Sequence, residues 1–372
     1  MPSSHGTTPT TGQGSPRRPR GGVVSGYVLR LIREQLDLPQ DGLAEQLRVS
    51  ADTVAGWETG RRPLTAVPVG QMLVHRHRLL RLGAQPALLA ALDKAMEADV
   101  LLTSVIEDDG DADASPLGAW VMQRDLVELL AWPLTGDTPE ALREVPQPRK
   151  ARRGPAAPSP QLPAPERTHL FSQLRRTAET ATAPGTFLLR RQALYLAGYD
   201  HAPDASAWLA EQQRRRAPDD WLSRWLAARS VASVATRFGD RDRLAHFVGA
   251  ELLDDDRGEA ANLEYWAYWV GEIQQIELSD DFMATGRTGA WEGRKLFRHL
   301  LARLAPAHGY LDLYVHTMRS LLAARLDLLR ATAGGAEALR ERVAVLLDDG
   351  HTSAQARREL DAILYAIRLS QA

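Results

Sequence analysis

Hydrophobic residues recur at three- and four-residue spacing along most of the chain, which is the pattern of helices that bury one face. Two examples lie in the C-terminal half: Leu188, Ala193, Leu196 and Ala197, and then Leu313, His316, Thr317, Leu321 and Ala324. The strict alternation of apolar and polar residues that marks a half-buried strand is almost absent. The sequence therefore predicts an all-α protein.

Composition divides this helical pattern into five segments. Residues 1–24 are polar and rich in Ser, Thr, Pro and Gly, which predicts a disordered tail. Residues 25–82 hold a compact set of short helical patterns, and residues 83–145 continue them as an acidic helical extension. Residues 146–167 contain seven prolines among basic and small residues, as in a semi-rigid extended linker. Residues 168–372 are predicted to form a larger α-helical array for regulation and dimerisation.

Two turns in the last segment resemble each other. Residues 197–200 and 237–240 each place a glycine at the end of one helix and an aspartate where it can cap the next. The two aspartates, Asp200 and Asp240, lie 40 positions apart. This spacing resembles the helix pairs of tetratricopeptide-like arrays, although a regular repeat of about 34 residues is not found.

Three short helices are predicted within residues 29–63. Pro39 suits the first turn of the second helix, Ser50 is a natural N-cap for the third, and Gly60 with Pro63 ends it. The inward-facing positions are Leu29, Ile32, Leu36, Leu43, Ala44, Leu47, Val54 and Trp57. The second and third helices, joined by a tight turn, form a unit whose last helix can enter the major groove of DNA.

This segment resembles the XRE-type, or lambda-repressor/Cro-like, family of helix-turn-helix regulators. The residues that carry the resemblance are, in order, Arg33, Gln40, Leu43-Ala44-Glu45, Val49-Ser50, Trp57-Glu58, Gly60-Arg61 and Pro63. They cover about a sixth of the chain. The resemblance implies a bacterial transcription regulator that binds double-stranded DNA as a homodimer, in the cytoplasm at the nucleoid, and whose C-terminal domain senses a small-molecule or protein effector.

The resemblance also implies roles for individual residues. Arg33 and Glu58 would form a structural ion pair between the first and third helices. Gln40 would bond a phosphate or a neighbouring side chain. The residues expected at the DNA are Gln40, Ser50, Ala51, Asp52, Thr53, Gly56, Arg61 and Arg62, with the two arginines along the phosphate backbone.

Three departures from the family pattern lower the expected sequence discrimination. Arg48 replaces the usual glycine of the turn, and Gly42 lies inside the second helix. The positions that would meet base edges are poor in hydrogen-bonding groups: Ala51 can touch only a thymine methyl, Asp52 can accept from cytosine but repels phosphate, and Gly56 offers no side chain.

The charge distribution suits a molecule whose first part meets a polyanion. Residues 1–82 carry 11 basic and 6 acidic side chains, a net charge of +5, and residues 83–145 carry 3 and 13, a net charge of −10. Residues 146–167 carry 5 and 1, a net charge of +4. The basic runs at residues 17–21 and 149–153 either reach DNA or are solvated disordered segments, and the sequence leaves both open.

The aromatic-rich residues 262–272 have two interpretations. The favoured interpretation, because it is the commoner case, is a core helix whose aromatic rings pack on neighbouring helices. The other is one wall of an effector pocket formed by Asn262, Tyr265, Trp266, Tyr268 and Trp269. Further polar and opposing residues of such a pocket would be Glu264, Glu272, Trp291, His299 and His316.

No catalytic motif is present in the sequence. Nucleophile elbow, phosphate loop, dinucleotide fingerprint and zinc-ligand spacing are all missing, and the chain contains no cysteine. We therefore expect no enzyme activity, no cofactor and no metal. The apolar runs are too short to span a membrane, so a membrane location is not expected. An alternative function is a protein-interaction module in which the helix-turn-helix is only a weak DNA tether.

Overall fold

The computed structural model describes residues 21–107, 115–143, 145, 157–214, 219–285, 291–306, 308–350 and 352–371. All regular secondary structure within these ranges is helical, so the all-α prediction is confirmed. The arginines at positions 17, 18 and 20, the acidic loop at residues 108–114 and the basic run at residues 149–153 lie outside the described residues.

The first helices in chain order are α1 (Val23–Gln35), α2 (Gln40–Leu47), α3 (Ala51–Glu58), α4 (Val69–Arg81), α5 (Pro86–Ile106), α6 (Arg124–Thr135), α7 (Glu140–Arg143), α8 (Ala164–Thr180) and α9 (Phe187–Ala197). They are followed by α10 (Ala205–Arg214), α11 (Trp221–Arg237), α12 (Asp242–Glu251), α13 (Asp256–Trp269), α14 (Arg294–Arg303), α15 (Leu311–Ala324), α16 (Leu328–Ala331), α17 (Gly335–Asp348) and α18 (Ala354–Gln371). Short 3₁₀ turns lie at Leu64–Ala66, Pro116–Gly118, Pro184–Thr186 and Asp280–Ala284.

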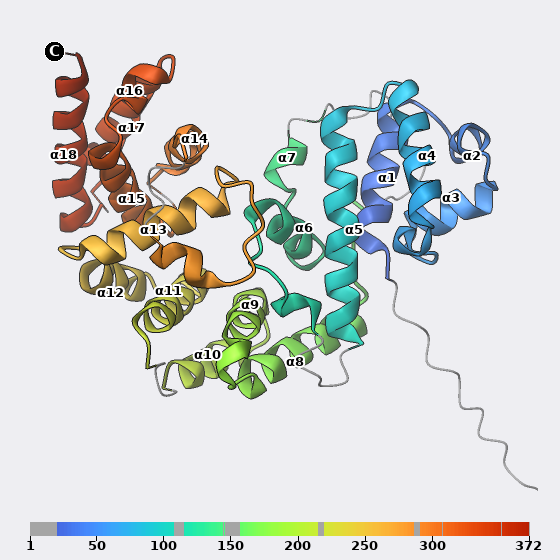
Figure 1. Cartoon of the computed structure of the whole chain (residues 1–372), viewed down its shortest axis with the longest axis horizontal. Helices are drawn as coiled ribbons and strands as arrows, with labels where there is room; N and C mark the ends of the chain where they lie inside the picture. Colours follow the sequence, from blue (N-terminus) through green and yellow to red (C-terminus); the bar gives the residue numbers. More distant parts are fainter. Residues whose placement is uncertain are drawn as a thin grey trace, which may run out of the picture.

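The long helix α5 occupies the middle of the molecule (Figure 1). The helices α1 to α4 lie on one side of it, and the chain passes through α6 and α8 to the C-terminal helices on the other side (Figure 1). α5 is 21 residues long and buries apolar residues along most of its length, among them Leu88, Leu92, Ala95 and Leu102. It packs directly against α1, α6 and α8. Because these neighbours come from both predicted helical domains, α5 joins them physically.

Two clusters of buried hydrophobic residues form the core, and the predicted linker does not separate them. The first cluster begins at Val24 of α1, continues through α5, α6, α8 and α9, and ends at Val234 and Ala235 of α11. The second contains the other end of α11 and most of the helices from α12 to α18. The N-terminal helices therefore share one continuous core with the first helices of the C-terminal array.

The described end of the predicted linker belongs to this shared core. Leu162 is 8 % exposed within the first cluster, and the hydroxyl of Tyr27 in α1 donates to the carbonyl of Pro158 at 2.6 Å. Helix α8 begins at Ala164, earlier than the predicted end of the linker at residue 167. Pro165 does not prevent this start, because the N–H groups of the first helical turn have no partner within the helix.

The buried carboxylate of Asp99 in α5 holds the start of α1. Its two oxygens accept the backbone N–H groups of Val24 at 2.9 Å and Ser25 at 2.8 Å. These donors belong to the first turn of α1, where no helical carbonyl can reach them and the helix dipole favours a negative charge. Asp99 is only 2 % exposed, and this burial raises the pKa of its carboxyl to about 6 against the lowering effect of its hydrogen bonds.

The raised pKa of Asp99 predicts a specific pH dependence of stability. The native state takes up the proton at a higher pH than the unfolded chain, so the stability from this group is largest below about pH 4 and is lost as pH rises through about 6. We expect the difference in unfolding free energy between the parent chain and Asp99→Asn to shrink by about 2–3 kcal/mol from pH 4 to pH 7. Urea unfolding across this range measures it. A difference that grows with pH would contradict the assignment.

Candidate DNA-contacting face and ligand pocket

Arg33 of α1 and Glu58 of α3 lie in direct contact. Nε of Arg33 donates to Oε1 of Glu58 at 2.5 Å, and Nη2 donates to Oε2 at 3.0 Å. The third nitrogen, Nη1, donates to the carbonyl of Leu38 at 2.9 Å. Gln40, the first residue of α2, donates to the same Glu58 carboxylate at 2.7 Å. The Glu58 side chain is 4 % exposed, so one buried carboxylate ties the first three helices together.

Two backbone positions fix how α3 sits. A Cβ on Gly26 of α1 would lie 2.1 Å from the carbonyl oxygen of Trp57, so glycine allows α1 and α3 to approach backbone to backbone. Arg48, between α2 and α3, adopts a left-handed conformation with φ +57°. A residue with a Cβ pays for that conformation with about 1–2 kcal/mol, which explains why glycine suits this turn. The close approach at Gly26 depends on α3, which is distant in sequence, so the residues around Gly26 do not reveal it.

The exposed end of α3 carries several of the residues expected at DNA. Ala51 and Asp52 are exposed, and Ser50 caps the helix by accepting the N–H of Thr53 at 3.1 Å. Thr53 also accepts a hydrogen bond from Arg62 at 3.1 Å. Gly56, in contrast, is buried, and the aliphatic part of Arg62 covers the place where its Cβ would be. Gly56 therefore presents no surface for a base edge in this arrangement.

Asp52 binds both arginines that follow the helix. Nη2 of Arg61 lies 2.5 Å from Oδ1 of Asp52, and Nη2 of Arg62 lies 3.0 Å from Oδ2. The hydrogen bond and charge of Arg61 hold the pKa of the Asp52 carboxyl below its usual value. All three side chains are at least half exposed, so the pairs can exchange for other partners at small cost. The charges of the two arginines that were expected at phosphate are thus partly neutralised within the chain.

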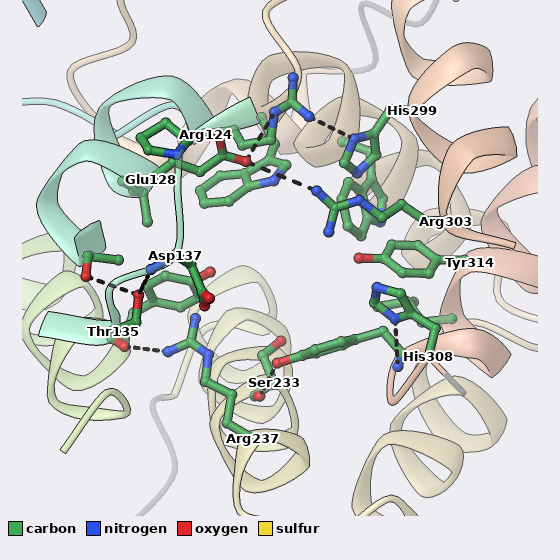
Figure 2. A pocket seen from close by; sticks show the side chains of 18 of the residues that line it. Arg124, Glu128, Thr135, Asp137, Ser233, Arg237, His299, Arg303, His308 and Tyr314 are labelled. Carbon is green, nitrogen blue, oxygen red and sulfur yellow. Dashed lines mark hydrogen bonds and ion pairs between the residues drawn. The ribbon is translucent and has the colours of Figure 1, made fainter. Parts of the chain in front are cut away.

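A pocket of about 350 Å³ lies among α6, α9, α11, α13, α14 and α15. Figure 2 shows its side chains pointing toward one another from these helices. Five arginines line it: Arg124, Arg143, Arg229, Arg237 and Arg303. Aromatic rings form much of the remaining wall: Tyr195, Tyr199, Tyr265, Trp266, Trp269, Tyr310 and Tyr314.

One end of the pocket holds a network of opposite charges (Figure 2). Nη1 of Arg124 lies 2.6 Å from Oε2 of Glu140, and Nη2 of Arg303 lies 3.2 Å from the same oxygen. Arg124 also donates to Nδ1 of His299 at 3.0 Å. Burial, together with the charges of Arg124 and Arg303, lowers the pKa of His299 to about 3. The neutral ring accepts at Nδ1 and therefore carries its proton on Nε2.

Arg229 of α11 is buried without a carboxylate beside it in the described part of the chain. It is 4 % exposed, donates to Oδ1 of Asn262 at 3.0 Å, and lies over the rings of Tyr265 and Trp266 at 4.0 and 5.2 Å from their centroids. Burial lowers the pKa of this guanidinium. An arginine nevertheless keeps its proton at neutral pH, so its charge remains in the pocket wall.

Arg237, two turns further along α11, has neutral partners as well. It donates to the carbonyl of Tyr195 at 2.8 Å and to the hydroxyl of Tyr199 at 3.2 Å. Its guanidinium lies 4.1 and 3.9 Å from the centroids of the same two rings. Burial raises the pKa of Tyr195 well above its ordinary value, so this phenol is uncharged at neutral pH. The hydrogen-bond and ring partners of Arg237 among the described residues are thus all neutral.

The five residues proposed for the aromatic pocket divide between the two interpretations. Tyr265, Trp266 and Trp269 line the pocket. Asn262 is fully buried and positions Arg229 from behind, while the hydroxyl of Tyr268 donates to the carbonyl of Val121 at 2.6 Å on another face of α13. The helix is therefore core on one face and pocket wall on the other.

The residues expected to oppose this helix also divide. His299 lines the pocket. Trp291, which lies just before α14, donates to the buried Glu264 of α13 at 3.2 Å, and His316 of α15 contacts Glu359 of α18 at 2.7 Å. Glu272 accepts the backbone N–H of Leu296 at 3.2 Å at the start of α14. These polar residues thus hold helices together and do not line the pocket.

The α11 arginines were not anticipated, although a signal exists. Arg229 lies on a helix face that also carries Trp225, Leu226 and Ala232, all buried. A charged residue within an apolar face marks either a buried ion pair or a binding site. The sequence does not say which, because the answer depends on side chains from other helices.

Comparison of the chain with known protein families, with curated proteins and with solved structures finds no match in any of the three. Across the described residues, no group of histidine, aspartate and glutamate side chains has the arrangement of a metal site. None of the described helices has the length and hydrophobicity to span a bilayer.

Breaking the Glu58 contact should destabilise the protein. Glu58→Ala leaves the largely buried Arg33 without its charge partner and removes the acceptor of Gln40, a loss of roughly 3 kcal/mol. Thermal and urea unfolding of the full chain measure it. Glu45→Ala, on the exposed face of α2, is the matched control and should change stability by less than about 0.5 kcal/mol. Equal stability of the two variants would refute the structural role of the pair.

Proposed function

We propose that this protein is a DNA-binding transcription regulator in which α3 contacts the double helix and the aromatic pocket senses an effector. The observation that carries the proposal is the Arg33–Glu58–Gln40 cluster. It holds the eight-residue α3 against α1 and leaves its first turn, with Ala51 and Asp52, at the surface. The residue pattern resembles that of XRE-type regulators at the same positions, which supports the same use of α3.

The side chains around α3 favour backbone contacts over base recognition. Ala51 and Asp52 offer little to a base edge, while Arg61 and Arg62 lie beside them and suit phosphate. Both arginines must exchange Asp52 for phosphate, and Asp52 itself repels the polyanion. We therefore expect modest affinity, strong salt dependence and modest sequence preference.

The packing around α6 supports communication between pocket and DNA face. One side of α6 lines the pocket with Arg124 and Glu128. Its other side places Trp132 against Tyr27 of α1, edge to face, with ring centroids 4.9 Å apart. α1 in turn packs on α3. A ligand that favours one position of α6 thereby biases the position of α1 and of the DNA-contacting helix.

Dimerisation is the remaining part of the proposal. Helix α4, next to the DNA-contacting unit, leaves Val69, Leu73 and Leu80 exposed by 77, 60 and 46 %. These positions share one side of the helix, so a second copy of the chain can cover them and place two α3 helices on neighbouring turns of DNA. Light scattering of the DNA complex should give two chains per duplex. One chain per duplex would contradict this part.

The competing function is a protein-interaction module with a weak DNA tether. The neutralisation of Arg61 and Arg62 by Asp52 favours it, because the face has little free positive charge. The two functions differ in what Asp52 does. In a regulator, removal of Asp52 frees the arginines and strengthens DNA binding, which is the protein's main activity. In an interaction module the main activity is binding of the protein partner, and removal of Asp52 leaves that binding unchanged.

Replacement of the arginines and of Asp52 should shift DNA binding in opposite directions. Arg61→Ala with Arg62→Ala should weaken specific and random DNA about equally and flatten the slope of log affinity against log salt by up to ~2. Asp52→Ala should strengthen binding to both, because a negative charge leaves the interface. Fluorescence anisotropy with labelled duplexes at several salt concentrations measures both effects.

The matched control replaces two exposed arginines far from α3, Arg298→Ala with Arg342→Ala, and should leave the salt slope unchanged. An unchanged slope in the Arg61 and Arg62 variant would place those side chains away from DNA. Weaker binding by Asp52→Ala would show that the Asp52 pairs support the interface and do not oppose it.

A further inference from the structure

The pocket carries more positive charge than its own acidic residues neutralise. Glu128 and Asp137 are its lining carboxylates, and Glu140 pairs with Arg124 and Arg303 at one end. Arg229 and Arg237, both from α11, have only carbonyl, amide, hydroxyl and ring partners within hydrogen-bond or ion-pair distance among the described residues. Burying a guanidinium with no counter-charge is costly unless something else supplies the charge.

We infer that the pocket binds a small aromatic organic anion, whose carboxylate or phosphate group contacts Arg229 or Arg237 and whose ring packs on the tyrosine and tryptophan wall. The assignment rests on the ligand-sensing half of the proposed function and is independent of DNA contact. Arginine suits this task because its planar fork donates two parallel hydrogen bonds to a carboxylate or phosphate.

The wall favours a flat ligand over a compact inorganic ion. Tyr265 and Trp269 lie nearly parallel, with ring planes 13° apart and centroids 6.2 Å apart. Their neighbours around the cavity are also aromatic, so a ring in the pocket meets aromatic faces on several sides. A volume of about 350 Å³ accommodates a single substituted ring and its acidic group.

Two lining side chains also have hydrogen-bond donors without a partner in the described structure. The proton of His299 lies on Nε2, because Nδ1 accepts from Arg124, and this nitrogen is buried and unpaired. Nε1 of Trp266 is likewise buried and unpaired. Such donors are costly while they stay unsatisfied, and both belong to side chains that line the pocket.

Calorimetric titration of the full chain, with no DNA present, tests the assignment. The probes are phenyl phosphate and terephthalate, with benzyl alcohol as the neutral ring and inorganic phosphate as the anion without a ring. We expect phenyl phosphate, terephthalate or both to bind at least about ten-fold more tightly than either control, and to change the tryptophan fluorescence. The difference between the two probes tells whether phosphate or carboxylate suits the site. Inorganic phosphate bound as tightly as both probes, or no binding by either probe at millimolar concentration, would overturn it.

A pair of matched variants separates a ligand-binding arginine from a structural one. Arg229→Met removes an uncompensated buried charge, so it should keep or raise the melting temperature while weakening the bound probe at least about ten-fold. Arg191→Met is the control. Arg191 of α9 is equally buried but is paired with Asp280 at 2.6 and 3.0 Å, so its loss should lower the melting temperature clearly.

Arg237→Met is the second binding variant. Arg237 is half-buried, so its replacement disturbs the core less than replacement of the buried Arg229 does. It should also weaken the bound probe. If both variants fold and bind the probe as the parent chain does, the pocket is not an anion site. DNA affinity of the parent chain keeps the outcomes distinct, since a parent chain that binds the probe but not DNA would count against the regulator proposal alone.

Discussion

The carboxylate of Asp99 joins two parts of the chain that are about 75 residues apart in sequence. It accepts the first N–H groups of α1, so the helix that carries Arg33 begins at a buried charge of α5. The same α5 packs on α6 and α8, which places the N-terminal helices, the pocket helix α6 and the first helices of the C-terminal array in one core. The position of α3 therefore depends on α5 as well as on α1 and α2, which contact α3 directly.

Charge placement follows one rule in the two candidate sites. In both the α3 face and the pocket, arginines are the charged groups that a ligand would meet. The two sites differ in the partners that these arginines have within the protein. Arg61 and Arg62 share the exposed Asp52, which makes their release easy and their free charge small. Arg229 keeps its proton at neutral pH although it is buried, and no described carboxylate lies beside it to neutralise that charge. The first arrangement suits reversible contact with a long polyanion, and the second suits a small anion enclosed on several sides.

The sequence predicts the helical class and the three short N-terminal helices because periodicity, Ser50, Gly60 and Pro63 are local signals. The contact of Arg33 with Glu58 follows from the family resemblance, and the structure has it. Local signals do not reveal the Asp99 cap, the close approach at Gly26 or the charge of Arg229, since each depends on a distant segment. The aromatic helix α13 shows the same limit, because its periodicity does not tell which face meets the cavity and which meets the core.

Hydrogen exchange of the full chain tests the central claim, that the N-terminal helices and the pocket helix form one cooperative unit. Amides in the middle of α1, such as Val28 and Leu29, should exchange with the same free energy as those of Leu129 and Leu130 in α6, because both helices open only when their common core opens. Much faster exchange of α1 to α3 while α6 stays protected would contradict the account. In that case the N-terminal unit opens on its own, and the pocket has no packed route to α3.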